Sequence, residues 1–324
     1  MSRQHNPITH YRQQGVALIT AIFIVTIVAT SAAYIAFNEQ LWFRQTENRM
    51  DRAQSEAVRQ GAIEGAIIML LEDAKNNNTD HLNELWAKTP LAGEVGSGLF
   101  FATIGDAQGR FNLNNLLKKD GSPSGPDAEL FRRLLTILDM PAGLADAALD
   151  WLDKDTQRRS TGAEDIDYMG LEQGYRTAAS RFESVDELRL VMGFEPEMVD
   201  TLRDLVAALP ERSSININSA PEPVFKALFP APADLAAASA VFQQRGDKPF
   251  DNKSQLMSQM PAGQKKPDVD YDVKSSYFNV NVNTQFGRLN RWYETLIYRK
   301  DKTTGSLIWS SNRVLLIGTE KREE

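Results

Sequence analysis

The longest apolar run of the chain lies near its N terminus. Residues 16–37 form 22 consecutive positions without a charge, and most of them are Val, Ile, Ala, Leu or Phe. Such a run is long enough to cross a bilayer as a single helix. The preceding residues, 1–15, contain Arg3 and Arg12 but no acidic residue, which favours a cytoplasmic location for this leader. The pattern predicts a single-pass membrane protein whose remaining chain is exported.

Helical patterning continues beyond the apolar run. Small and aliphatic residues recur at helical spacing as far as Leu71, and charged residues can occupy the opposite face. The sequence predicts one helix over residues 16–73, roughly 85 Å long at the usual rise per residue.

Strand-like patterns occur on both sides of a long middle region. The stretches 98–104, 277–283, 292–299 and 307–317 are rich in β-branched and aromatic residues, and a turn-like segment, 302–306, joins the last two. A lone strand at 98–104 is not stable by itself. We therefore expect it to join the C-terminal strands in an antiparallel sheet that packs on the exposed half of the long helix.

The middle region, 112–272, is mainly helical in pattern and predicts an inserted α domain. Candidate helices are 128–139, 144–152, 185–192, 197–209, 222–228 and 235–244. Two capping boxes mark helix starts: one runs from Ser184 to Glu187, and the other runs from Ser219 to Glu222 with Pro221 in the first turn. The predicted fold class is α+β. Its membrane helix is 16–37, and its main domain combines 38–111 with 273–324.

The insertion contains a weak internal repeat. The motif Phe-Asn-Leu-Asn at 111–114 returns as Ile-Asn-Ile-Asn at 215–218, and Phe-Glu-Ser at 182–184 is echoed by Phe-Asp-Asn at 250–252. The repeat predicts two related helical units, 112–210 and 211–272.

Composition removes several classes of function. The chain has 36 Lys plus Arg against 43 Asp plus Glu, a net charge of −7, and no Cys. Disulfides, thiolate metal sites and Cys nucleophiles are therefore excluded, and three His residues leave little for a zinc site. The segment 215–220 resembles the opening of helix-hairpin-helix DNA-binding modules, but 18 cations against 27 acids in 112–272 disfavour a nucleic-acid partner. The alternative is that these Asn side chains bond backbone groups and cap the next helix.

The densest polar cluster lies between residues 150 and 167. Six carboxylates occur within 18 residues, offset by three cations: Lys154, Arg158 and Arg159. Oxygen ligands from two arms of a loop favour Ca²⁺ over Mg²⁺, although the spacing is not that of an EF-hand. The alternative is a solvated acidic loop partly paired with Arg158 and Arg159. Paired carboxylates also serve glycoside hydrolysis, but no nucleophile motif, phosphate loop or His network accompanies them, so we expect no enzyme.

The residues around the start of the apolar run resemble a type IV prepilin leader. Residues 14–19 read Gln-Gly-Val-Ala-Leu-Ile. The resemblance implies cleavage by prepilin peptidase between Gly15 and Val16, with methylation of the new N terminus. The alternative is a simple anchor preceded by a Gly. Most subunits of that superfamily have Glu as the fifth mature residue, whereas this chain has Thr20. A carboxylate in hydrocarbon persists only where it has a partner, so its loss suits a subunit with no neighbour above it.

That departure, together with the insertion, resembles the minor pseudopilins of the type II secretion system protein K (GspK) family, and the similarity covers nearly the whole chain. The resemblance implies two SAM-like subdomains in the insertion. The elements Asp-Trp-Leu-Asp-x-Asp and Gly-Ala-Glu-Asp-x-x-Tyr also resemble the family's calcium loop. It implies a structural Ca²⁺ on Asp153, Asp155, Glu164 and Asp165, with Asp150 and Asp167 as further candidates.

The family implies an inner-membrane protein with its C-terminal domain in the periplasm, at the tip of the pseudopilus, where it helps initiate and cap assembly for export of folded proteins. The implied partners are minor pseudopilins of types I, J and H, the major pseudopilin, prepilin peptidase, the inner-membrane assembly platform, the lipid bilayer and exported proteins. Two alternatives remain: a minor pilin-like component of type IV pili or DNA uptake, and a membrane-anchored periplasmic hydrolase.

Overall fold

The computed structural model describes residues 13–230, 234–262 and 265–313, and side chains are described for 16–230, 235–262 and 265–306. Most of the leader and the predicted strand end at 314–317 lie outside the described residues.

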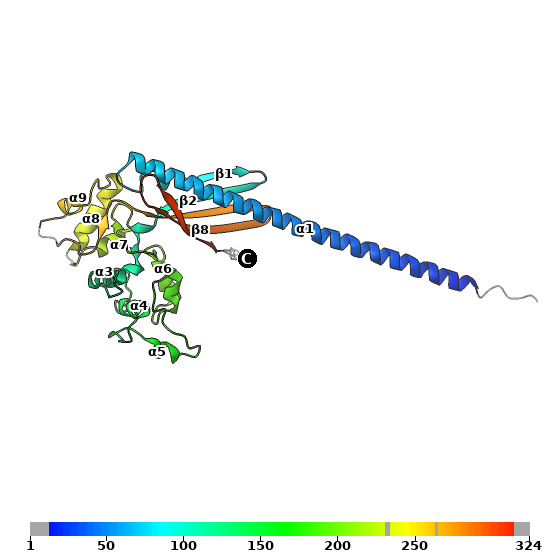
Figure 1. Ribbon diagram of the computed structural model, residues 1–324, viewed down its shortest axis with the longest axis horizontal. Coiled ribbons are helices and arrows are strands. Elements are labelled where there is room, and N and C mark those ends of the chain that lie inside the picture. The colour runs from blue at the N-terminus through cyan, green and yellow to red at the C-terminus, as the bar shows by residue number, and fades with distance from the viewer. Residues whose placement is uncertain (1–12, 231–233, 263–264, 314–324) are drawn as a thin grey trace, which may run out of the picture.

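A single long helix, α1, dominates the shape of the molecule (Figure 1). It runs from Gln13–Asn76, 64 residues, and confirms the predicted continuous helix. Its N-terminal part extends away from the rest of the molecule, and the apolar span within it, which is long enough to cross a membrane, is entirely exposed. Its C-terminal part packs on the sheet through Ala62, Ile63, Ala66 and Leu70.

The sheet has five antiparallel strands in the order β1-β2-β7-β8-β9. Their bounds are β1 Leu91–Val95, β2 Gly98–Asp106, β7 Tyr277–Phe286, β8 Leu289–Arg299 and β9 Gly305–Arg313. The predicted strand at 98–104 therefore joins the C-terminal strands, as expected, whereas β1 was not anticipated. Alternate residues of β7, such as Phe278, Val280 and Val282, are buried against α1, which is the period-two pattern of a half-buried strand.

The inserted region lies at the end of the sheet that is far from the N terminus, and it projects to one side of α1 (Figure 1). Its helices are α3 Gly125–Ile137, α4 Leu144–Leu152, α5 Asp165–Met169, a 3₁₀ helix Val185–Leu190, α6 Pro196–Leu202, α7 Glu222–Ala227, α8 Asp234–Asp247 and α9 Ser254–Gln259. Shorter elements precede them: α2 Leu85–Lys88 and the 3₁₀ helices Ala107–Gly109 and Leu113–Leu116.

Three expectations for this region were wrong. The insertion is not purely helical, because β3 Phe111–Asn112 pairs in parallel with β4 Val206–Ala207, and β5 Ile215–Asn216 pairs with β6 Tyr271–Asp272. The predicted helix 197–209 ends early, at Leu202, and Val206 and Ala207 within it form the buried strand β4. The capping box at Ser184 is confirmed, but Ser219 caps nothing, because its hydroxyl donates to Asp106 instead.

The two halves of the sequence repeat make the same hydrogen bonds. Asn114 donates to Phe182 O at 2.9 Å and accepts from Phe182 N at 2.8 Å. Asn218 makes the equivalent pair with Phe250 O and N at 3.0 and 2.8 Å. These Asn side chains thus satisfy buried backbone groups, as the structural alternative to DNA binding predicted. The SAM-like character of the two units stays a prediction.

Candidate functional site

The acidic loop between α4 and α5 gathers three of its predicted ligands. Asp153 directly follows α4, and Glu164 directly precedes α5. Asp153, Asp155 and Glu164 each offer a carboxylate oxygen within 4.8 Å of the others. Since Ca²⁺ binds oxygens at about 2.3–2.6 Å, two oxygens on opposite sides of one ion lie about 5 Å apart. The spacing therefore fits a single calcium ion.

Two oxygens of this group are buried without a donor. Asp153 Oδ1 and Glu164 Oε1 have no hydrogen-bond partner among the described residues. Burial raises the pKa of Glu164 to about 7, and repulsion by Asp150 and Asp153 acts in the same direction. Burial likewise raises the pKa of Asp153. A buried acceptor without a partner is costly, and a bound cation is one way to satisfy it.

The other three candidates face different partners. Asp150 forms an ion pair with Arg159, whose Nη1 also donates to Asp153 Oδ2 at 2.7 Å. Asp165 accepts from both N and Oγ1 of Thr177 at 2.9 Å, so its carboxylate is held away from the group.

Asp167 has a capping role at the start of α5. Its Oδ2 accepts from Glu164 N at 3.0 Å, and its Oδ1 accepts from Arg158 Nη1 at 3.2 Å. Arg158 and Arg159 are thus both paired with carboxylates of the loop, as the alternative of a solvated acidic loop expected. Asp153 Oδ1 and Glu164 Oε1 nevertheless remain buried without a hydrogen-bond donor among the described residues.

The cleavage-site residues lie in the first turns of α1. Gly15 and Val16 are helical, and the described side chain of Val16 is exposed. Thr20 Oγ1 donates to Val16 O and Ala17 O at 3.0 Å each. The fifth position of the implied mature chain therefore brings no charge and no unpaired donor into the apolar run.

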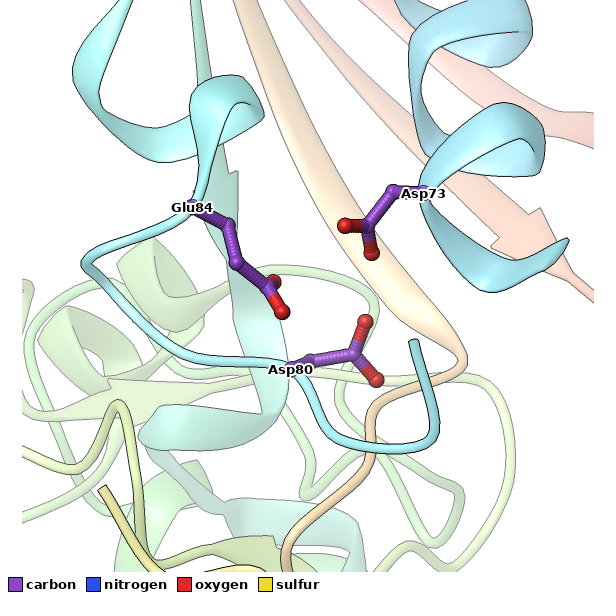
Figure 2. Close-up of side chains that lie close together, drawn as sticks. All are labelled: Asp73, Asp80 and Glu84. Atoms are coloured by element: carbon purple, nitrogen blue, oxygen red, sulfur yellow. The ribbon is translucent and has the colours of Figure 1, made fainter. Parts of the chain in front are cut away.

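A second acidic cluster lies at the other end of α1, and sequence reasoning missed it. Figure 2 shows Asp73 on α1 and Asp80 and Glu84 on the following loop, with their carboxylates turned toward one another. One oxygen from each lies within 4.8 Å of the others. Arg299, from β8, donates through Nη2 to both oxygens of Asp80 at 2.5 and 2.7 Å. Because both Asp80 oxygens are already taken by a guanidinium, we interpret this cluster as an ionic junction rather than a metal site.

The junction ties the inserted region to the main domain. Asp80 Oδ2 accepts from Ser275 N at 2.8 Å, and Ser275 Oγ donates to Asp106 at 2.6 Å. Asn216, on β5 of the insertion, donates to Asp106 at 2.7 Å and to Asp80 O at 3.0 Å. Burial raises the pKa of Asp106. The cluster therefore lies where the chain leaves and re-enters the sheet.

Glu84 should make stability depend on pH. Burial raises its pKa from 4.5 to about 7, even though His81 N and Trp86 Nε1 donate to it at 3.2 and 2.5 Å. A group with a raised pKa stabilises the fold at acidic pH, and that stability is lost as the pH rises through the folded-state value.

We expect Glu84→Gln to remove this dependence. Between pH 4.5 and pH 8.5 the variant should gain about 3 kcal/mol of unfolding free energy relative to the unmodified chain. The measurement is chemical unfolding of the full chain in detergent at several pH values. Glu94→Gln, at an exposed carboxylate on β1, is the control and should leave the pH profile unchanged. Parallel profiles for Glu84→Gln and the unmodified chain would contradict the assignment.

Comparison with known proteins identifies the family of the chain. A family model for type II secretion system protein K matches residues 109–211, and a second model with that description matches residues 215–276. Type II secretion system protein K of Pseudomonas aeruginosa is 35% identical over 290 residues, covering 85% of each chain. The chain belongs to the type II secretion system protein K family.

A second protein K sequence and a solved structure support the same family assignment. The relative from Klebsiella pneumoniae is 30% identical over 91% of this chain and 95% of its own. A crystal structure of the GspK-GspI-GspJ complex from enterotoxigenic Escherichia coli contains a chain with a TM-score of 0.74 and 25% identity, covering 83% of this chain and 99% of that one. The mixed fold with a long apolar helix and an antiparallel sheet is thus that of a protein K minor pseudopilin, a structural component of a secretion system.

Proposed function

We propose that this chain occupies the tip of the type II secretion pseudopilus, where it helps initiate and cap assembly for the export of folded proteins across the outer membrane. The observation that carries the tip position is Thr20, whose hydroxyl is satisfied within its own helix. A subunit with a Glu there offers a charge for a neighbour's amine, whereas this chain offers none.

The inserted region supports the same position. It projects sideways from the end of the sheet that is far from the N terminus (Figure 1). Subunits in a shaft stack closely along their helices, so a side projection of this size would collide with neighbours placed above it. At the tip that space is free.

We propose GspI-type and GspJ-type minor pseudopilins as direct partners, because the solved relative was crystallised with proteins of those names. Family membership is the ground for four further proposed partners: a type H subunit, the major pseudopilin, the assembly platform and prepilin peptidase. The proposed location is the inner membrane, with α1 crossing it and the sheet and insertion in the periplasm, since α1 has an exposed apolar span near its N terminus. Contact with exported proteins belongs to the same proposal.

The processing step gives the first test. In cells with active prepilin peptidase, we expect mass spectrometry of the membrane-bound protein to find a methylated N terminus at Val16. Gly15→Val should leave the leader in place and reduce export to the level seen without this protein. Thr20→Ser, which keeps the hydroxyl, is the matched control and should be processed normally.

The tip position needs a separate measurement. A tag on the insertion should be found by immunogold microscopy at one end of each pseudopilus. Labelling along the shaft would refute the tip position, and an intact leader in the unmodified chain would refute membership of the processed fibre.

We also propose that Asp153, Asp155 and Glu164 hold a structural calcium ion. The support is their shared spacing and the two buried oxygens without donors. The ion supplies positive charge that offsets the repulsion among the carboxylates. The residues themselves connect the end of α4 to the start of α5, so the ion fixes both ends of the loop. Asp150 and Asp167 support this arrangement through Arg159 and the α5 cap, and the two units of the insertion are proposed to be SAM-like.

A further inference from the structure

A short stretch of α1 lies between the apolar run and the part that packs on the sheet. The first buried residue along α1 is Ser55, and residues 39–50 are exposed among the described parts of the chain. Within this stretch Trp42 is 74% exposed and Phe43 is 65% exposed. Large aromatic side chains exposed on a helix indicate a site of contact with a membrane or with another protein.

The distance from the apolar run places these aromatics just outside the hydrocarbon. The 22 uncharged residues of the run are about 33 Å long as a helix, which fits a hydrocarbon core of about 30 Å with a moderate tilt. Trp42 lies five residues beyond Phe37, about 7.5 Å further along the axis. That depth corresponds to the headgroup layer, where Trp is enriched because its ring is apolar and its N–H is polar.

The arrangement around the helix favours lipid over a neighbouring helix. A helix partner is met by apolar residues spaced three and four apart, which form one stripe. The residues three and four positions from Trp42 are Asn38, Glu39, Gln45 and Thr46, all polar. Leu41, Trp42 and Phe43 instead follow one another directly and so point in three directions around the axis. A bilayer surrounds a helix on all sides, whereas a partner covers one side.

We propose that Leu41, Trp42 and Phe43 form a band that binds the headgroup layer of the periplasmic leaflet and fixes the depth of α1 before assembly. The following residue, Arg44, is exposed and within reach of lipid phosphates. This proposal rests on the membrane position of α1 in the proposed function. Its consequence is that the sheet and the insertion are held at a defined height above the bilayer.

The test uses the full-length chain in vesicles of phosphatidylcholine and phosphatidylglycerol. Co-flotation with the vesicles tests the membrane position independently of the band. The fluorescence of Trp42 is obtained by subtracting the spectrum of Trp42→Phe from that of the unmodified chain. The control is Trp292→Phe, because Trp292 is 37% exposed and lies on the sheet.

We expect the Trp42 component to be blue-shifted and at least twofold more strongly quenched by lipids brominated near the headgroup than by lipids brominated near the chain end. The Trp292 component should be unaffected by either lipid. A floated protein whose Trp42 component is water-like and unquenched would overturn the band while leaving the membrane position intact. A blue shift that appears only after sibling subunits are added would overturn it in favour of a helix-contact surface.

Discussion

Replacing Arg299 with methionine is expected to lower the free energy of unfolding by about 3–5 kcal/mol, because it leaves buried carboxylates without their cation. Arg299 is 8% exposed and Asp80 is 2% exposed. The guanidinium also donates to Ser275 O at 2.8 Å and to Leu70 O at 3.1 Å, so three segments, including that of Asp80, lose a common partner. Its Cζ lies 4.7 Å from the centre of the Phe278 ring, and that contact is lost as well.

Two further variants separate the charge from the packing. Arg288→Met, at an exposed turn residue, should change stability by no more than about 0.5 kcal/mol. Adding Asp80→Asn to Arg299→Met should restore part of the loss, since the uncompensated charge is removed. Urea unfolding of the full chain in detergent measures all three. An Arg299→Met variant that is as stable as the Arg288→Met control would show that the junction does not hold the insertion in place.

The ionic junction could not be predicted from the sequence, unlike the long elements of the fold. Long local patterns were enough to predict α1 and the sheet strands β2, β7, β8 and β9, but not β1, because burial on one face imposes a period on each of the predicted elements. Asp80 and Arg299 are 219 residues apart, and the sequence near either residue contains no pattern that predicts their ion pair. The parallel pairs β3–β4 and β5–β6 were missed for a related reason: each strand is two residues long, too short to show alternation.

The acidic loop was predicted in part. Its residue types and two-armed layout indicated oxygen ligands, and the structure gathers Asp153, Asp155 and Glu164. Asp165 is directed elsewhere by Thr177, which lies 12 residues further along the chain and carries no sequence signal of its own. Composition alone cannot show that Asp153 and Glu164 each keep a buried oxygen without a donor, whereas Asp165 accepts two hydrogen bonds from Thr177.

Calcium should raise the stability of the chain, and the response should depend on Glu164. At a calcium concentration of 100 times the dissociation constant, binding to the folded state alone adds about 2.7 kcal/mol. Asp155→Asn and Glu164→Gln should each remove most of this gain, measured as the change in melting temperature between calcium and chelator. Glu172→Gln, at an exposed carboxylate after α5, is the matched control and should keep the full response.

Glu164→Gln should change stability in opposite directions with and without calcium. Without metal, Glu164 is a buried carboxylate beside Asp150 and Asp153, so Glu164→Gln should be at least as stable as the unmodified chain in chelator and less stable than it in calcium. Asp165→Asn should keep the calcium response, because Asp165 bonds Thr177 and lies outside the group of three carboxylates. A response lost in this variant would add Asp165 to the ligands. An unmodified chain whose melting temperature ignores chelator, and in which elemental analysis finds no bound metal, would rule out the site, since its two buried orphan oxygens would then be satisfied without a cation.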